Sequence, residues 1–367
     1  EYPWDPGRRY PMPPVPRNAP AGAMAAGCAV LGIRTADAPA AVLSRGFRGA
    51  DGTWRPPCVS CGYCHQGCRN GAKGGTDNTF LPWAVAHGAE IRPECFAHGL
   101  ERDGQGRVTA VIYRDRDGIE HRQRCAAVFL CMGAVETPRL LLHLGLCNSS
   151  DQVGRNYTAH VATQAWGTFD NEMRPNRGYP SSLITEDFVR PRDADFAGGY
   201  LIQSLGCVPQ TWADGVARGR PELWGRPLLD YLHNYNRTAG SGINGECLPC
   251  DANRLTLSNE TDATGLPKPR ISFGYSENER RLNAHAARVL RAIWEAAGAR
   301  DIQYAHIGVP VPSKRSVVDG SYDVAWTLHF ADPAAQDRYQ VDPVLLAFVV
   351  RCQQLWDRVV VHDSLAV

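Results

Sequence analysis

Four cysteines stand close together in the first fifth of the chain, at Cys58, Cys61, Cys64 and Cys68. Their spacing, C-x2-C-x2-C-x3-C, allows four sulfurs to reach one centre without help from distant residues, and ferredoxin-type loops that hold iron–sulfur clusters have the same spacing. Thiolates select iron–sulfur clusters, zinc or Cu(I) over hard cations, and nearby glycines permit the positive φ values of a tight loop. We interpret this run as a metal site, with an iron–sulfur cluster favoured.

Two other states of the four cysteines stay open. They could hold a zinc ion that only staples the loop, or they could be disulfides or free thiols. The chain has 13 cysteines in all. That number alone does not decide between an oxidising and a reducing compartment.

The bulk composition limits the partners of the chain. With 367 residues it can bury a large core, and two or three domains are expected. The 39 basic and 38 acidic residues leave a net charge of +1, which gives no electrostatic case for binding nucleic acid. No apolar run approaches the roughly 18 residues that cross a bilayer, so no transmembrane segment is expected. A small neutral ligand fits this composition better.

Hydrophobic periodicity predicts the elements that position these residues. The N-terminal 22 residues are rich in proline and are expected to be an extended arm. Helices are predicted at 23–31, 80–88 and 278–297, the last with Ser276 as its N-cap. Strands are predicted at 89–93, 97–101, 107–114, 120–124, 200–203 and 254–257. The strands between 97 and 124 form an antiparallel meander in this prediction.

An uninterrupted apolar run at 126–131 is typical of a strand buried on both faces of a parallel sheet. Small residues at 132–135 and a helical pattern from Arg139 follow it. This order of strand, turn and helix presents backbone N–H groups to a phosphate-bearing ligand at the edge of an open α/β sheet. An ordinary corner between a strand and a helix is the alternative.

Several strings give the chain a resemblance to a known family. Met132 to Leu142, with its Glu-Thr-Pro-Arg-Leu-Leu-Leu segment, is similar to the glucose-methanol-choline (GMC) flavin oxidoreductases, particularly the large subunits of gluconate, fructose and glucose dehydrogenase type. The cysteine run with Asn70-Gly71-Ala72-Lys73 resembles the same group. Further strings that carry the likeness lie at 151–156, 242–249, 253–257 and 265–267. It covers most of residues 8–320.

The resemblance implies an α/β (α+β) fold in three parts. Residues 1–156 would be a partial FAD-binding Rossmann-like domain with the cysteine-rich loop, residues 157–275 an antiparallel-sheet substrate-binding domain, and residues 276–367 a helix and a divergent return to the FAD-binding domain. The Gly-x-Gly-x-x-Gly turn of such domains does not occur in this sequence. We therefore expect an N-terminally truncated chain.

The resemblance also implies a chemistry, which is the FAD-dependent oxidation of a CH–OH group in an alcohol or sugar. The expected FAD contacts are Ala97, Gly133, Ala134, Thr137, Pro138 and Asp332. In some relatives a C-x5-C-x3-C run carries a 3Fe–4S cluster, and Cys58, Cys64 and Cys68 match it. Cys61 would then be a fourth ligand, as in a 4Fe–4S cluster, or a spectator.

A histidine suits the base that takes the hydroxyl proton, because its pKa lies near the working pH. The resemblance places this base at His306, and a second active-site group at Asp342, where a carboxylate stands in place of a neutral donor. Electrons would leave to a cytochrome c or a small subunit. The same likeness implies a periplasmic or membrane-associated enzyme, held by a partner subunit. The opposing hypothesis is an inactive truncated remnant, or a non-catalytic electron-transfer or metal-binding module.

Overall fold

A six-stranded antiparallel sheet forms the centre of the molecule. The structure is a computed structural model and describes residues 10–49, 51–192, 194–219, 223–307 and 346. The strand order is β1-β8-β9-β10-β7-β13, and each neighbouring pair is antiparallel. The bounds are β1 Ala36–Asp37, β7 Ala162–Thr168, β8 Leu183–Thr185, β9 Tyr200–Leu205, β10 Thr238–Gly245 and β13 Arg300–Ile307.

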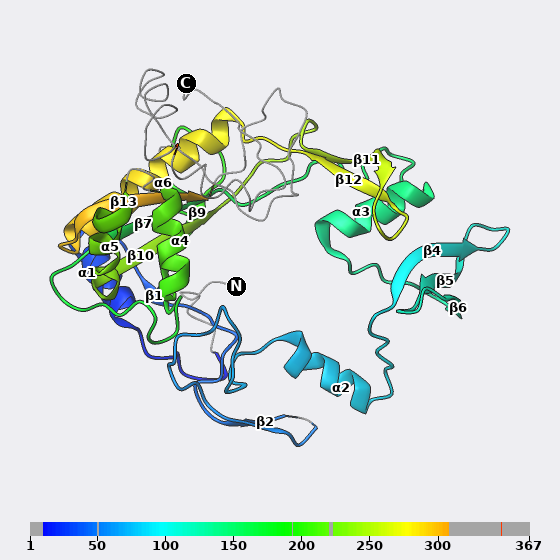
Figure 1. The fold of residues 1–367 in the computed structure, drawn as a ribbon, viewed down its shortest axis with the longest axis horizontal. Helices are drawn as coiled ribbons and strands as arrows, with labels where there is room; N and C mark the ends of the chain where they lie inside the picture. The colour runs from blue at the N-terminus through cyan, green and yellow to red at the C-terminus, as the bar shows by residue number, and fades with distance from the viewer. Residues whose placement is uncertain (1–9, 50, 193, 220–222, 308–345, 347–367) are drawn as a thin grey trace.

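Helices cover both faces of this sheet (Figure 1). Successive strand residues point to opposite faces, so Ala165 of β7 packs with α1 (Ala19–Val30) and α6 (Glu277–Ala296), whereas Trp166 packs with α4 (Pro209–Gly219) and α5 (Gly225–Leu232). The α1 and α6 side holds the main core. The sheet with its two helical layers is the compact part of the structure.

Helices α1 and α6 approach each other very closely at Gly27. A Cβ atom at this position would lie 2.2 Å from the carbonyl oxygen of Ile293, so only glycine allows this contact. Helix α1 begins at Ala19, four residues before the predicted start, because the side chain of Asn18 accepts a hydrogen bond from the N–H of Ala21 and acts as the N-cap. The predicted helix is therefore confirmed and longer.

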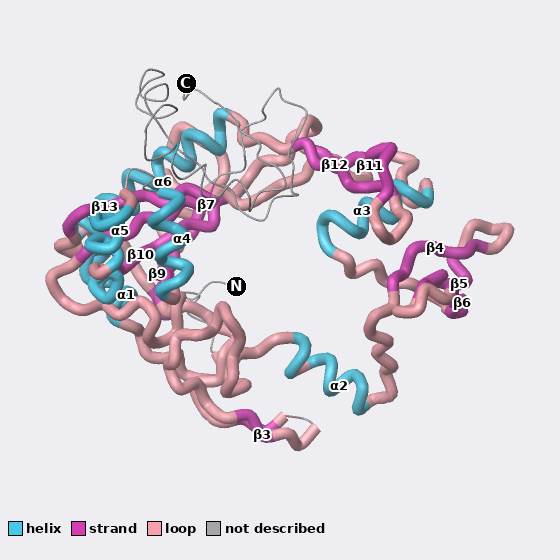
Figure 2. The backbone as a smooth tube through the Cα atoms, viewed as in Figure 1, coloured by secondary structure: helices cyan, strands magenta, loops and turns pink. Residues whose placement is uncertain are grey.

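The remaining elements lie outside the six-stranded sheet, and most of them are at a distance from it (Figure 1). They are β2 Phe47–Arg48, β3 Trp54–Arg55, the 3-10 turn η1 Thr76–Asn78, α2 Phe80–Ala86, the meander β4 Phe96–Arg102, β5 Val108–Arg114 and β6 Glu120–Arg124, α3 Gly133–Leu144, the 3-10 turn η2 Tyr235–Arg237 beside the sheet, and the hairpin β11 Arg254–Thr261 and β12 Pro267–Ser272. Figure 2 shows that the segment between β3 and α2 is mainly loop. The predicted meander is confirmed.

The predicted buried strand at 126–131 is wrong. The structure gives this segment no strand, and Phe129 is 88% exposed. A strand needs at least one neighbouring strand for its backbone hydrogen bonds, and no strand of the described ranges pairs with this segment. Residues 89–93 likewise form no strand. The described residues are thus a mixture of helices and antiparallel sheets.

Arg139 of α3 ties the helix to the β11–β12 hairpin. The residue is 4% exposed, and its guanidinium donates to the Pro267 carbonyl (2.8 Å), to the Asp262 carboxylate (2.5 Å) and to the carboxylate of Glu136 (3.0 Å). Thr264 and Arg139 hold the pKa of Asp262 well below its usual range, because both donate hydrogen bonds to the charged carboxylate. Two of the strings that carry the family likeness therefore meet at one buried guanidinium.

The three expected domains stay a prediction, but α1 bears on their boundaries. Helix α1 falls in the first expected domain, yet it packs on strands β9 and β10 of the second. Among the helices that the structure describes, none has the length and apolar character needed to cross a bilayer.

Truncation of Leu290 tests the core between α6 and the sheet. Leu290 is fully buried in the main cluster, so we expect Leu290→Ala to lower the free energy of unfolding by about 2–5 kcal/mol. Urea unfolding followed by circular dichroism measures this change. The control is Arg288→Ala on the exposed side of the same helix, with an expected change of about 0.5 kcal/mol or less. Equal losses in both variants would contradict this packing.

Glu279 gives the fold a dependence on acid pH. It is 2% exposed, and its carboxylate accepts hydrogen bonds from the N–H groups of Ser276 (2.8 Å) and Leu248 (3.1 Å). Burial raises the pKa of Glu279, but these bonds and the Ser276 hydroxyl outweigh it, so the pKa lies below its usual value. The resulting stability is present above the unfolded pKa of about 4.3 and is lost as the pH falls through the folded pKa.

We therefore expect Glu279→Gln to be less stable than the wild type at pH 7. The difference in free energy of unfolding should shrink progressively below about pH 4, because the wild-type carboxyl also becomes neutral there. Urea titrations of both proteins between pH 7 and pH 3 measure this difference. A difference that stays constant over the whole range would show that the charge of Glu279 contributes nothing.

Candidate functional site

The cysteine loop, residues 56–75, is closed at its base by side chains from both of its ends. The guanidinium of Arg55 donates to the carbonyls of Gly71 (3.0 and 3.1 Å) and Lys73 (3.1 Å). The side-chain amide of Asn70 donates to the carbonyl of Pro57 at 2.6 Å. These bonds bring the first and last cysteines of the run together, because they join the backbone before Cys58 to the backbone after Cys68.

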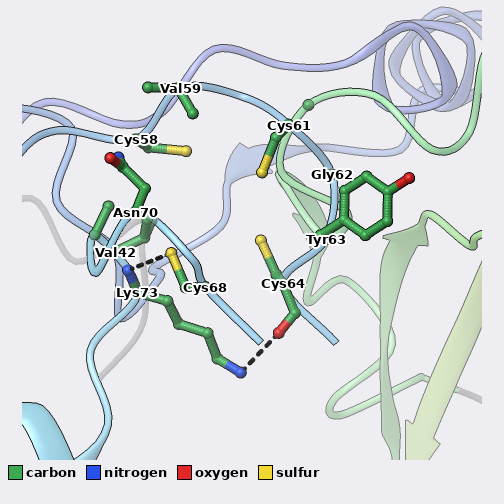
Figure 3. Close-up of a pocket in the computed structure, with 12 residues that line it drawn as sticks. Val42, Cys58, Val59, Cys61, Gly62, Tyr63, Cys64, Cys68, Asn70 and Lys73 are labelled. Carbon is green, nitrogen blue, oxygen red and sulfur yellow. Dashed lines mark hydrogen bonds between the residues drawn. The ribbon is translucent and has the colours of Figure 1, made fainter. Parts of the chain in front are cut away.

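The four sulfurs of the loop point toward one common space (Figure 3). Cys58, Cys61, Cys64 and Cys68 line a single cavity of about 10 Å³. All cysteines in the described ranges are free thiols, so the disulfide alternative is not formed in this structure. Across those same ranges, no three or more His, Cys, Asp or Glu side chains are grouped closely enough to hold a metal ion.

The pKa values of two of the four cysteines, Cys64 and Cys68, are shifted in opposite directions. The pKa of Cys64 is raised, first by burial and then by the charges of the three other cysteines, while Lys73 opposes the shift. Burial also raises the pKa of Cys68, but backbone N–H donors of residues 70–73 outweigh it, so this pKa lies below its usual value. The N–H of Lys73 lies 3.3 Å from the Cys68 sulfur. Cys68 is therefore more ready than Cys64 to become a thiolate.

Lys73 also fixes the opposite side of the loop. Its ammonium donates to the carbonyl of Cys64 at 2.9 Å (Figure 3). The N–H of Ser60 donates to the Cys58 sulfur at 3.4 Å, with Ser60 at a φ of +55°. Backbone N–H groups directed at sulfur stabilise thiolates and tune clusters that thiolates hold. The sequence prediction missed the roles of Arg55, Asn70 and Lys73, although Asn70 and Lys73 stand in a string that carried the resemblance.

The loop rests directly on the segment 172–178 that follows β7. A Cβ atom at Gly62 would lie 1.8 Å from the carbonyl oxygen of Asn176, and Gly62 has a φ of +84°. The N–H of Gly178 donates to the carbonyl of Ser60 at 2.9 Å. The cysteine loop is thus attached to the sheet domain by backbone contacts that tolerate only glycine at residue 62.

The donor groups of the loop suit an iron–sulfur cluster, but the volume of its cavity is too small for one. Four thiols, backbone N–H groups at two sulfurs and a nearby ammonium are the surroundings that a cluster with thiolate ligands requires. A cavity of about 10 Å³ has room for one water molecule at most. Loading of a cluster would therefore require the sulfurs to move apart.

The residues expected to contact FAD lie around the start of α3. Gly133, with a φ of +77°, and Ala134 are exposed at the N-terminus of this helix, and the hydroxyl of Thr137 accepts a hydrogen bond from the N–H of Met132 at 3.2 Å. Pro138 lies inside the same helix. Strand β4, which carries Ala97, contacts α3. The exposed N–H groups and small side chains leave room for a phosphate.

The expected catalytic residues are only partly placed. His306 lies in the edge strand β13, with its backbone in register with Thr163 of β7, and its side chain is not described. Asp332 and Asp342 lie outside the described residues. The roles of these three residues therefore remain predictions.

Comparison with known families gives two matches. The family described as GMC oxidoreductase matches residues 17–162, which include the cysteine loop, the meander and α3. The family described as stress responsive A/B barrel domain matches residues 277–366, and these include His306, Asp332 and Asp342. The GMC match thus covers the segment with the expected site around α3, and it does not reach the three expected residues near the C-terminus.

Several curated proteins are similar to this chain over a longer stretch than the GMC family match. The fructose dehydrogenase large subunit of Gluconobacter japonicus is 30% identical over 286 residues, which are 74% of this chain and 51% of that protein. A long-chain-alcohol oxidase of Arabidopsis thaliana is 33% identical over 194 residues, 49% of this chain and 25% of the oxidase. The paromamine 6'-oxidase of Streptomyces fradiae is 27% identical over 68% of this chain and 45% of the oxidase. The chain spans about half, or less, of the length of these relatives.

Among solved structures, that of pyridoxine 4-oxidase from Mesorbium loti matches 70% of this chain and 48% of that chain. Its TM-score is 0.41 and its sequence identity is 13%, so this likeness supports no conclusion. The assignment rests on the sequence matches. The strings expected to carry the likeness between the cysteine loop and α3 lie inside the matched segment. On the match over residues 17–162 and the identity with curated members, this chain belongs to the GMC oxidoreductase family.

Proposed function

We propose that this chain is part of an FAD-dependent dehydrogenase that oxidises a CH–OH group of an alcohol or sugar and passes electrons on through an iron–sulfur cluster. The observation that carries the proposal is the combination of a GMC match with four cysteine sulfurs that face one space inside the matched segment. The printed names of the relatives, which include a fructose dehydrogenase and an alcohol oxidase, support this class of substrate.

The residues around α3 would bind the phosphate end of the flavin cofactor. The N–H groups of the exposed residues Gly133 and Ala134 would donate to an anionic oxygen, and Gly133 leaves the approach open because no side chain stands there. When bound, FAD supplies the acceptor for a hydride from the carbinol carbon. The imidazole of His306 would take the hydroxyl proton, because its pKa allows it both to accept and to release a proton.

The cysteine loop would hold the second redox group. Cys58, Cys64 and Cys68 match the run with three ligands, and Cys61 faces the same space as a fourth. Backbone N–H groups at the Cys58 and Cys68 sulfurs and the ammonium of Lys73 offset the negative charge of the thiolates. When bound, a cluster supplies one-electron transfer to an acceptor such as a cytochrome c or small subunit. A periplasmic or membrane-associated location through such a subunit is part of the same proposal.

A non-catalytic module is the second candidate function. One observation favours it, which is that the segment 126–131 forms no strand. A chain of this kind would load iron without binding FAD. Titration with FAD, followed by the flavin fluorescence, separates the two candidates, because only the enzyme is expected to quench it in a saturable way.

Substitution of Cys64 tests the cluster. We expect Cys64→Ser to abolish iron loading when the protein is reconstituted with iron and sulfide without oxygen, because serine removes a central thiolate ligand. Visible absorbance and iron content measure the loading. The control is Cys147→Ser, a free thiol that is exposed and lies outside the loop, which should load as the wild type does. Full iron content in Cys64→Ser would rule out this ligand set.

Removal of the proposed base tests the catalytic assignment. In flavin-loaded protein, His306→Ala should slow the reduction of FAD by a sugar or alcohol substrate by roughly 100-fold or more, because the hydroxyl proton has no acceptor. Stopped-flow absorbance of the flavin band gives the rate. His233→Ala is the control, since this residue lies at the end of α5, away from β13 in the sequence. A near-normal rate in His306→Ala would remove His306 from the mechanism.

A further inference from the structure

A second cavity, of about 300 Å³, lies beside the cysteine loop and has no place in the proposed chemistry. It is formed where the start of α1, the segment 172–178 and the loop residue Ser60 meet. Its volume is at the lower end of the range for small-molecule sites. Three arginines, Arg17, Arg174 and Arg177, line it together with a single acidic residue, Glu172.

The charges around the cavity leave one guanidinium available. Arg17 pairs with Asp37 at 2.5 Å, and Arg174 pairs with Glu172 at 2.7 Å. Arg177 is exposed, and among the described residues its guanidinium makes no hydrogen bond and no ion pair. Two of the three positive charges are thus offset locally, and the remaining one is that of Arg177.

The backbone fixes the place of Arg177. Its carbonyl accepts a hydrogen bond from the side-chain amide of Asn18 at 3.3 Å, and its N–H donates to the carbonyl of Arg174 at 2.9 Å. A Cβ atom at the next residue, Gly178, would lie 2.7 Å from the Cβ atom of Asn18. The segment is therefore held against the N-cap of α1, and Arg177 projects from a fixed piece of backbone.

The backbone N–H groups of Ala21 and Gly22, at the start of α1, are not available to a ligand in the cavity. The N–H of Ala21 is bonded to the side chain of Asn18, and the N–H of Gly22 to its carbonyl. The charged donors at the cavity are guanidinium N–H groups, and a guanidinium binds two oxygens of one carboxylate or phosphate side by side. An oxyanion is the ligand that this geometry suits.

We propose that this cavity binds a small molecule through a carboxylate or phosphate group, with Arg177 as the bidentate donor and the remaining donors of Arg17 and Arg174 around it. The site is separate from the positions proposed for FAD and for the cluster, and it does not depend on either. It does adjoin the cysteine loop, because Gly178 lines both cavities and donates a hydrogen bond to Ser60. Occupation of the site would hold that contact in place.

Calorimetric titration of the full chain with inorganic phosphate, and separately with acetate, tests the site. We expect saturable binding of at least one anion in the millimolar range, and the tighter of the two identifies the head group. Arg177→Gln should weaken this binding about tenfold or more, because it removes a charge-assisted bidentate pair. Arg177→Lys should retain part of the affinity, because it keeps the charge without the fork.

The matched control is Arg270→Gln, which removes an exposed arginine of β12 outside the cavity. Circular dichroism spectra of all variants confirm that they fold. Binding that is lost in Arg177→Gln and kept in Arg270→Gln supports the site. Equal weakening in both variants would show that the anions respond only to net charge. That result, or the absence of saturable binding of either anion to the wild type, overturns the proposal.

Discussion

The contact between α1 and α6 at Gly27 is the constraint on which the rest of the structure depends. Because no side chain stands at this position, the two helices approach closely enough to form one layer over the sheet. The N-cap of α1, Asn18, then reaches the segment 172–178, and this segment carries the cysteine loop. The cysteine loop is in this way attached to the segment that follows β7 of the sheet.

Four thiols that lie close together would repel one another when ionised, and the surrounding groups offset only part of this repulsion. Ionised thiols near one another repel, and the raised pKa of Cys64 reflects this repulsion as well as burial. Backbone donors around Cys68 and the ammonium of Lys73 act in the opposite direction. A bound cation would offset the charge of ionised thiols, and this is the physical argument behind the proposal of a metal site in the loop.

Local patterns predicted the local structures well. The capping box of Ser276 and Glu279 and the alternation in the meander are properties of short segments, and both were predictable. The run at 126–131 has the composition of a buried strand. A strand also needs a second strand for its backbone hydrogen bonds, and no strand among the described residues pairs with this run. The buried position of Arg139 was not predictable for a related reason, because its partners Asp262 and Pro267 lie more than 120 residues away in the sequence.

In the candidate site, too, features made of residues close in the sequence were predictable and features made of distant residues were not. The cluster of cysteines was predictable because all four lie within eleven residues of the sequence. The cavity at Arg177 was not, because residues near 17, 60 and 175 come together only in the folded chain. The roles expected of His306, Asp332 and Asp342 depended on a distant likeness at the C-terminal end, where a different family, that of the stress responsive A/B barrel domain, matches.

The central claim is that a chain of the GMC family uses its cysteine loop as a redox centre. The most direct test is the metal and sulfide content of the protein purified without oxygen, measured by mass spectrometry of the elements together with a sulfide assay. The account predicts three or four irons and about four sulfides per chain. One zinc per chain without sulfide, or disulfides among the four cysteines without metal, would contradict it.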